Sequence, residues 1–243
     1  MKKILLIALT VLLTIACNKK PKEKIELLPY GESEITQGTI VLVLGEVFEF
    51  TIANSSIDTY LKVEDFRVAE LNSYQDESGQ KVYVITPNNK GKTYLTVTDY
   101  KDELKFEINV KMMTISYSLN FTIKQNSGVL EITPLVSNLP KNCENFLLVL
   151  GNSKTDKVLD FRHLDRQQLE IYQSSETAEV MFRDTLNLQK KNQDERSYEL
   201  SLYALTQQLI LPSGYSYSEL LELLEGSSIF SCMVAFTYTL ADE

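Results

Sequence analysis

Tryptophan is absent from this sequence of 243 residues, and histidine occurs only once. Glycine and proline are also scarce, at nine and six residues, which excludes a collagen-like or low-complexity chain. A zinc site takes several His or Cys ligands, which one imidazole cannot supply. No residue pattern assembles a catalytic, metal or cofactor site. We therefore expect a non-enzymatic protein with neither metal nor cofactor.

Basic side chains are outnumbered by acidic ones, at 24 against 33, and the net charge is −9. Binding to a phosphate backbone requires a basic surface, so this balance argues against a nucleic-acid partner. Hydrophobic residues make up 44% and charged residues 23% of the chain, which is globular composition. The length allows one or two domains of roughly 100–200 residues each.

The N-terminus has the features of an exported protein. Lys2 and Lys3 precede an apolar run over residues 4–15, which is shorter than the ~20 residues of a membrane-spanning helix. A basic start and a short apolar core are typical of a signal peptide. The run ends in Leu13-Thr14-Ile15-Ala16-Cys17, which resembles the lipobox of bacterial lipoproteins. This resemblance implies removal of residues 1–16 and lipidation of Cys17; the alternative is an ordinary cleaved signal peptide.

Residues 17–30 are expected to form a lipid-anchored tether. Cleavage after residue 16 would remove two lysines and change the net charge from −9 to −11. Lysines at 19, 20, 22 and 24 follow the cysteine, and basic side chains beside a lipid favour anionic headgroups. Some Gram-negative lipoproteins that this sequence resembles carry an acidic run there when they are exported to the cell surface. The lysines therefore favour an outer-membrane anchor facing the periplasm.

Residues 31–111 alternate between apolar and polar side chains, the pattern of half-buried strands. Strands are expected at residues 40–44, 47–52, 81–85, 93–97 and 104–110. Gly31-Glu32-Ser33, residues 65–71 and Gly91-Lys92-Thr93-Tyr94-Leu95-Thr96-Val97 occur in an order similar to that of bacterial Ig-like domains. The resemblance implies an Ig-like β-sandwich and says nothing of an activity.

Residues 112–243 are expected to form a second β-rich module, which resembles no known family. Strands are expected at residues 115–123, 129–132, 146–150, 180–182, 197–205 and 230–238. One short helix is expected over residues 164–172, with His163 on the surface at its start. Another is expected after Ser216, which forms a capping box with Glu219. We predict a second β-sandwich with one or two short helices; the alternative is a mixed α+β sheet.

Four residues of the second module are candidates for disulfide or ligand chemistry. Cys143 and Cys232 would lie in an exported compartment, where they either form a disulfide or remain an exposed and a buried free thiol. Tyr215 and Tyr217 flank the start of a helix and, if exposed, could stack on a sugar or anchor an interface. The alternative for both tyrosines is ordinary packing.

Thr185 is a candidate modification site. Asp184-Thr185-Leu186 matches a loose O-glycosylation signal, Asp-(Ser/Thr)-apolar, that some Gram-negative anaerobes use on envelope proteins.

These observations favour a non-enzymatic cell-envelope lipoprotein, held to the membrane through Cys17. Its Ig-like spacer would present the second module to a protein partner. One alternative is a glycan-binding lipoprotein of a polysaccharide-uptake system, against which the lack of tryptophan argues. Another is a pilin-like subunit, which would lose an N-terminal strand and assemble by strand pairing between copies.

Overall fold

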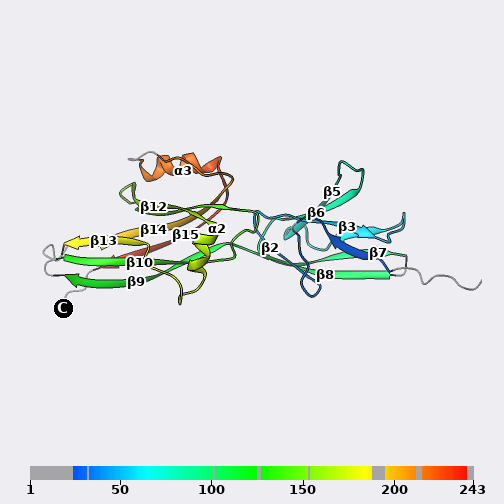
Figure 1. Cartoon of the computed structure of the whole chain (residues 1–243), viewed down its shortest axis with the longest axis horizontal. Helices are drawn as coiled ribbons and strands as arrows, with labels where there is room; N and C mark the ends of the chain where they lie inside the picture. The colour runs from blue at the N-terminus through cyan, green and yellow to red at the C-terminus, as the bar shows by residue number, and fades with distance from the viewer. Residues whose placement is uncertain are drawn as a thin grey trace, which may run out of the picture.

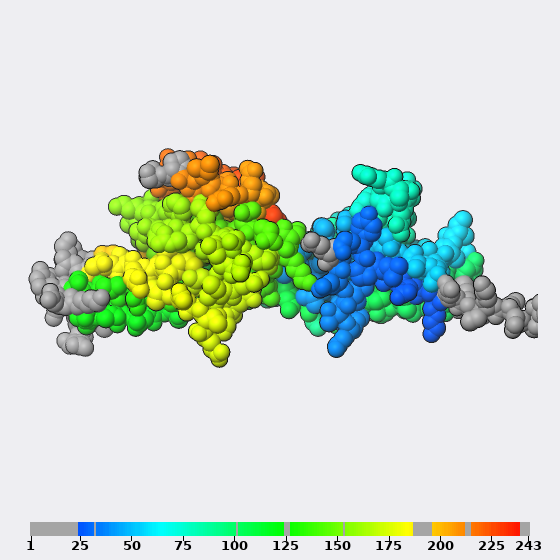
Figure 2. All heavy atoms as spheres, viewed as in Figure 1, coloured from blue at the N-terminus to red at the C-terminus, as the bar shows by residue number. Residues whose placement is uncertain are grey.

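The structure, a computed structural model, describes residues 24–31, 33–100, 102–124, 127–152, 154–187, 195–211 and 215–239. The expected signal peptide, Cys17 and the tether up to residue 23 lie outside the described residues. The described chain is mainly β, as the sequence predicts, and its strands form four sheets. They make two sandwiches placed end to end, with a narrower waist between them (Figures 1 and 2).

Module 1 comprises the strands between residues 26 and 111. One of its sheets has the order β1-β3-β6-β5 and the other β2-β8-β7-β4. Neighbouring strands are antiparallel except β2 and β8, which run parallel. The bounds are β1 Glu26–Pro29, β2 Thr39–Val43, β3 Phe48–Ala53, β4 Tyr60–Val63, β5 Ala69–Gln75, β6 Lys81–Pro87, β7 Gly91–Asp99 and β8 Asp102–Lys111.

Alternating side chains put the core of module 1 between its two sheets. In β7, Thr93, Leu95 and Val97 are buried on one face, whereas the residues between them face outward or are half-buried. Phe48 and Phe50 enter the same core from the opposite sheet. Each Å² of apolar surface removed from water stabilises the fold by about 25 cal/mol, and this burial holds the two sheets face to face.

The strand order of module 1 is that of an immunoglobulin constant-type domain. Lettered A to G in chain order, with β2 set aside, the strands form the sheets A-B-E-D and C-F-G. β2 adds to the second sheet by pairing in parallel with β8 along residues 39–43. The Ig-like sandwich expected from the sequence is therefore the observed fold.

Module 2 comprises the strands between residues 114 and 239. Its sheets have the orders β13-β10-β9 and β12-β11-β14-β15, and all their pairs are antiparallel. This is again a sandwich, with the fourth strand, β12, beside β11. The bounds are β9 Thr114–Lys124, β10 Ser127–Ser137, β11 Asn145–Asn152, β12 Lys157–Asp165, β13 Phe182–Asn187, β14 Glu195–Leu205 and β15 Ser228–Thr239.

Two short helical segments decorate module 2, as expected. α2 (Arg166–Glu170) continues into the 3-10 helix η1 (Ile171–Gln173) and is capped by Asp165. α3 (Tyr217–Glu225) lies outside the sheet β12-β11-β14-β15 (Figure 1). The predicted capping box is confirmed, because the Ser216 hydroxyl accepts the Glu219 N–H while the Glu219 carboxylate accepts the Ser216 N–H.

Some expectations differ from the structure. β1 falls inside the segment 17–30 that was expected to be tether, and it pairs with β3. β4, β5 and β12 were not among the predicted strands. His163 lies in β12 and not at the start of a helix, which begins three residues later at Arg166. The mixed α+β alternative for the second module is wrong, since both of its sheets are antiparallel and form a sandwich.

Candidate functional site

The joint between the modules is built around a buried carboxylate. Glu46 follows β2 in module 1 and is only 5% exposed. Its Oε2 accepts the backbone N–H of Val43 at 2.7 Å, and its Oε1 accepts the backbone N–H of Lys141, in module 2. A buried carboxylate is stable when such hydrogen bonds replace its water. Glu46 therefore ties the end of β2 to the β10–β11 loop.

Further contacts close this joint. The Asn142 side-chain amide donates to the Gly45 carbonyl at 3.3 Å, and Lys141 Nζ lies 3.0 Å from Glu34 Oε2. Gly45 has a φ of +92°, and a Cβ there would lie 2.9 Å from the Ile229 side chain. Glycine is thus required both by the backbone and by the close approach of β15.

Apolar packing also crosses the joint. The side chain of Val43 is 7% exposed and belongs to the core of module 2, together with Met113. Only residues 112 and 113 separate β8 from β9. The two sandwiches are therefore joined by a short connection, a shared apolar contact and buried hydrogen bonds.

A pocket of about 190 Å³ opens beside the joint. Val41, Val47 and Phe48 give it an apolar wall, while Glu34 and Glu49 line it with carboxylates. Lys141, the cation in its lining, is held by Glu34 at the rim. The pocket accordingly has an acidic, partly apolar character.

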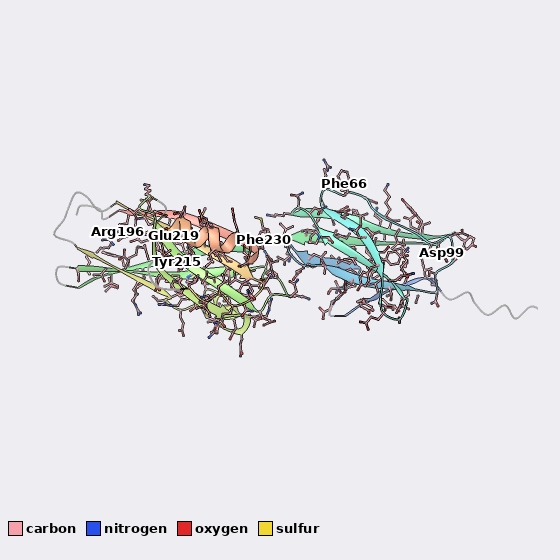
Figure 3. The ribbon with its side chains drawn as sticks, turned by 90° about the horizontal axis from the view of Figure 1, so that it is seen from above. Phe66, Asp99, Arg196, Tyr215, Glu219 and Phe230 are labelled. Carbon is pink, nitrogen blue, oxygen red and sulfur yellow. The ribbon has the colours of Figure 1, made fainter. Side chains whose placement is uncertain are left out.

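Tyr217, a predicted ligand contact, is the first residue of α3 and is buried between that helix and the sheet. It is 4% exposed, and its hydroxyl lies 3.1 Å from that of Ser201 in β14. Burial raises the pKa of its phenol. The exposure on which its predicted contact with a ligand depends is therefore not found at Tyr217. Tyr215 is half-buried beside the start of the helix (Figure 3), and its role in binding stays a prediction.

Cys143 and Cys232 are both free thiols, which is the second of the two alternatives given by the sequence. The burial expected for a pair of free thiols is reversed. Cys143 is buried, and its thiol donates to the carbonyls of Asn145 and Leu205, whereas Cys232 is half-buried in β15. Burial raises the pKa of both thiols, that of Cys232 to about 12.

Thr185 is exposed on β13, an edge strand of its sheet. The preceding Asp184 is engaged: its Oδ2 accepts the Tyr198 hydroxyl at 2.6 Å and Arg196 Nη1 at 2.7 Å. Glycosylation of Thr185 stays a prediction, with a hydroxyl that faces outward and a neighbouring carboxylate that has a structural role.

His163 lines a second pocket, of about 180 Å³, with Asn145, Asp165, Gln168 and Gln208. Its ring packs edge-on against Phe161 at 5.9 Å between centroids, and burial lowers the pKa of the imidazole. Asp165 and Gln168 are already bonded to each other's backbone in the helix cap. Among the described residues, no group of three His, Cys, Asp or Glu is placed to hold a metal ion.

β15 is an uncharged edge strand of the four-stranded sheet of module 2. In module 1, the last strand, β8, is covered by β2; among the described strands of module 2, the last strand, β15, pairs only with β14. Its twelve residues include no charged side chain, and Met233 is 58% exposed. Edge strands are commonly protected by charges or proline. β12, at the other edge of the same sheet, carries Lys157, Asp160, Arg162 and Asp165.

Sequence reasoning missed both the joint and this uncharged edge. Gly45-Glu46 directly after an apolar run was a signal for the end of a strand, but the contact of Glu46 with Lys141 spans 95 positions. The lack of charge in residues 228–239 was visible in the sequence. Only the strand order shows that these residues form an edge.

No family model and no curated protein sequence matches the chain. Domains 4 and 5 of the S-layer protein SbsC align with 35% of this chain and 53% of their own, at 14% identity and a TM-score of 0.24. A titin tandem aligns with 89% of this chain and 66% of its own, at 11% identity and a TM-score of 0.36. The Yersinia pseudotuberculosis adhesin InvE aligns with 88% of this chain and 58% of its own, at 10% identity and a TM-score of 0.26.

The chain thus spans about half to two thirds of the first two of these structures. The fold assignment rests on the strand orders described above. None of the helices in the described ranges is long and apolar enough to cross a membrane.

Proposed function

We propose that this chain is a non-enzymatic cell-envelope lipoprotein in which module 1 is a spacer and module 2 meets a protein partner. The observation that carries the proposal is the position of the two ends of module 1. The described chain enters at Lys24, whose carbonyl accepts the Asn54 side-chain amide, while the joint at Glu46 lies at the opposite end. A lipid on Cys17 would therefore hold module 2 away from the membrane.

The buried joint supports the role of a spacer. A flexible linker would let module 2 fold back towards the membrane, whereas hydrogen bonds to a buried carboxylate oppose such bending. Val43 strengthens the same restraint through its packing in the core of module 2.

We place the partner contact on β15. An uncharged edge strand offers backbone N–H and C=O groups to an added strand, and recognition by strand addition is a common mode of peptide binding. Ser231, Met233 and Ala235 are exposed on its outer face, so a partner strand would meet no charge there.

The anchor and the face of the membrane are tested by protease treatment of intact and lysed cells. Labelling with radioactive palmitate, lost in a Cys17→Ser variant, would support the anchor. Protection of the chain until lysis would support the periplasmic face. Cleavage on intact cells would contradict that placement and put the protein at the surface.

The contact is tested with a photo-crosslinking amino acid at Met233 in living cells, with Leu159 on the opposite edge of the sheet as the matched control. Leu159 is 44% exposed and lies on the charged strand β12. Discrete adducts from position 233 alone would support the proposal. Equal adducts from both positions, or none, would contradict it.

A second candidate function, self-association of two copies, is favoured by the same uncharged edge. Two β15 strands can pair antiparallel without bringing like charges together. The adduct at position 233 would then have twice the mass of the chain, and gels of unboiled protein would show a dimer, because pairing of two identical edges closes at two copies. An adduct of another mass would support the spacer and partner instead.

A further inference from the structure

The end of module 1 where the described chain begins carries unusually exposed apolar side chains. Ile57, in the β3–β4 loop, is 98% exposed. Tyr100, in the β7–β8 turn, is 66% exposed, and Tyr60, the first residue of β4, is 63% exposed. We call these three residues the tip. Asp99, adjacent to Tyr100, lies at the end of the molecule farthest from module 2 (Figure 3).

Hydrogen bonds hold the tip together. The Ser56 hydroxyl donates to Asp99, which joins the β3–β4 loop to the β7–β8 turn. Asn54, in the same loop, donates to the Lys24 carbonyl at 3.1 Å. The loop that carries Ile57, the turn that carries Tyr100 and the start of the described chain therefore form one surface.

Tyr100 occupies a backbone position that seldom carries an aromatic residue. Its φ is +52°, in the left-handed region that favours glycine and asparagine. Tight hairpin turns usually place Asn-Gly or Asp-Gly at such positions. Here the turn instead holds a tyrosine ring out from the end of the sandwich.

Chain length limits how far the tip can lie from the lipid. Seven peptide bonds separate Cys17 from Lys24, and even a fully extended segment of that length spans no more than about 25 Å. An anchor on Cys17 would therefore keep Ile57, Tyr60 and Tyr100 close to the membrane. Tyrosine is enriched at membrane interfaces, where its ring is buried and its hydroxyl stays wet.

We propose that the tip docks on the lipid surface, with Ile57 entering the acyl boundary and the two tyrosines at headgroup level. The inference rests on the proposed anchoring at Cys17. Docking would supply a second point of contact with the membrane, so that the long axis of the molecule stands away from it. Asp58, Asp102 and Glu103 are exposed nearby, so the tip itself suits zwitterionic lipids, whereas any attraction to anionic lipids would come from the lysines of the expected tether.

The absence of tryptophan provides a clean test. We would make Ile57→Trp and, as the matched control, Phe66→Trp, since Phe66 is 74% exposed on a different loop of module 1 (Figure 3). The full chain would be held on vesicles of phosphatidylethanolamine and phosphatidylcholine with brominated acyl chains, which quench nearby indole. The acyl groups on Cys17 would anchor the chain to the vesicles. If cells leave Cys17 unmodified, its thiol would instead be coupled to a lipid with a maleimide headgroup.

We expect the emission of Ile57→Trp to shift to shorter wavelength and to be quenched, while that of Phe66→Trp stays unchanged. Adding Tyr100→Asp to the Ile57→Trp chain should reduce the quenching. Equal, unquenched emission from both single variants would overturn the docking. Flotation of the chain with vesicles before any coupling tests the anchor separately, so failure of the anchor and failure of docking give different results.

Discussion

The carboxylate of Glu46, in module 1, accepts a hydrogen bond from the backbone N–H of Lys141, in module 2. The same side chain accepts the backbone N–H of Val43 at 2.7 Å. One carboxylate thus satisfies two donors that would otherwise be left without a partner when the modules meet. This buried side chain fixes contacts between the modules that a flexible linker would not make.

Replacing Glu46 by alanine should loosen this joint. A buried donor that loses its acceptor costs about 1–3 kcal/mol, so we expect a loss of stability of that order. Small-angle scattering should show a broader distribution of module orientations, and urea unfolding should report the stability. Glu34→Ala is the control, because Glu34 is 71% exposed and its pairing with Lys141 contributes little. Equal behaviour of the two variants would contradict the role given to Glu46.

The seat of α3 can be tested at Gly151, at the end of β11. A Cβ there would lie 2.5 Å from the Tyr217 ring, and crowding of this kind typically costs about 1–3 kcal/mol. Gly151→Ala should therefore lower the midpoint of thermal unfolding. Gly226→Ala, where a Cβ meets open space, should leave it nearly unchanged. If both variants unfolded at the same temperature, Tyr217 would not be the residue that holds α3 against the sheet.

The single histidine makes stability depend on pH. Burial lowers the pKa of His163, so the folded state binds the imidazole proton less readily than the unfolded chain does. In the unfolded chain, the pKa of the imidazole is about 6.5. The stabilisation is present above that value and is lost as the pH falls towards the folded pKa. Denaturant unfolding from about pH 7.5 down to about pH 5.5 should show the loss, and His163→Gln should flatten the profile. An unchanged slope in the variant would assign the effect to other groups.

We expect the two free thiols, Cys143 and Cys232, to react slowly with thiol reagents. At about pH 8, a thiol whose pKa is raised to about 12, as for Cys232, is almost entirely protonated, and the pKa of Cys143 is raised as well. In a Cys17→Ser chain, both thiols should react only after unfolding, and reducing agent should not change the melting temperature. A chain that needs reduction before either thiol reacts would show that the disulfide forms after all.

Modification at Thr185 can be separated from the structural role of Asp184. Thr185→Ala should remove any glycan mass from the purified chain and leave its stability unchanged, since Thr185 is exposed. Asp184→Asn should be destabilising, because it weakens hydrogen bonds from Tyr198 and Arg196 that involve a charge and contribute about 1.5–3 kcal/mol each. If the wild-type chain purified from its native host had the mass of the unmodified protein, the predicted glycosylation of Thr185 would be wrong.

Alternating apolar residues predicted the strands that bury one face, and a continuous apolar run predicted β11, which is buried on both, but β12 shows neither pattern. β12 contributes Leu164 to the inner core, while its Val158 and Phe161 pack beneath α3 on the outside. Its pairing with β11 also shifts register between Leu150 and Gly151. These two features remove the regular period of two. β1 and β4 have four residues each, too few to show a period at all.

The tyrosines of module 2 show what the sequence can and cannot give. The odd spacing of Tyr198 and Tyr203 predicts opposite faces of one strand, and the structure places Tyr198 in the inner core and Tyr203 under α3. The burial of Tyr217 was not predictable in this way, because it depends on where α3 lies relative to β11 and β14. Likewise, neither the uncharged edge at β15 nor the contact at Glu46 could be placed before the strand order was known.

The parallel pair β2 and β8 determines how the molecule would carry tension. A pull on module 2 would enter module 1 through the end of β8, whereas the proposed lipid anchor would resist through the start of the chain, which leads through β1 to β2. Five residue pairs, from Thr39 with Glu107 to Val43 with Lys111, connect the two strands. The load would act along these strands, in shear, so that their hydrogen bonds share it and do not open one at a time.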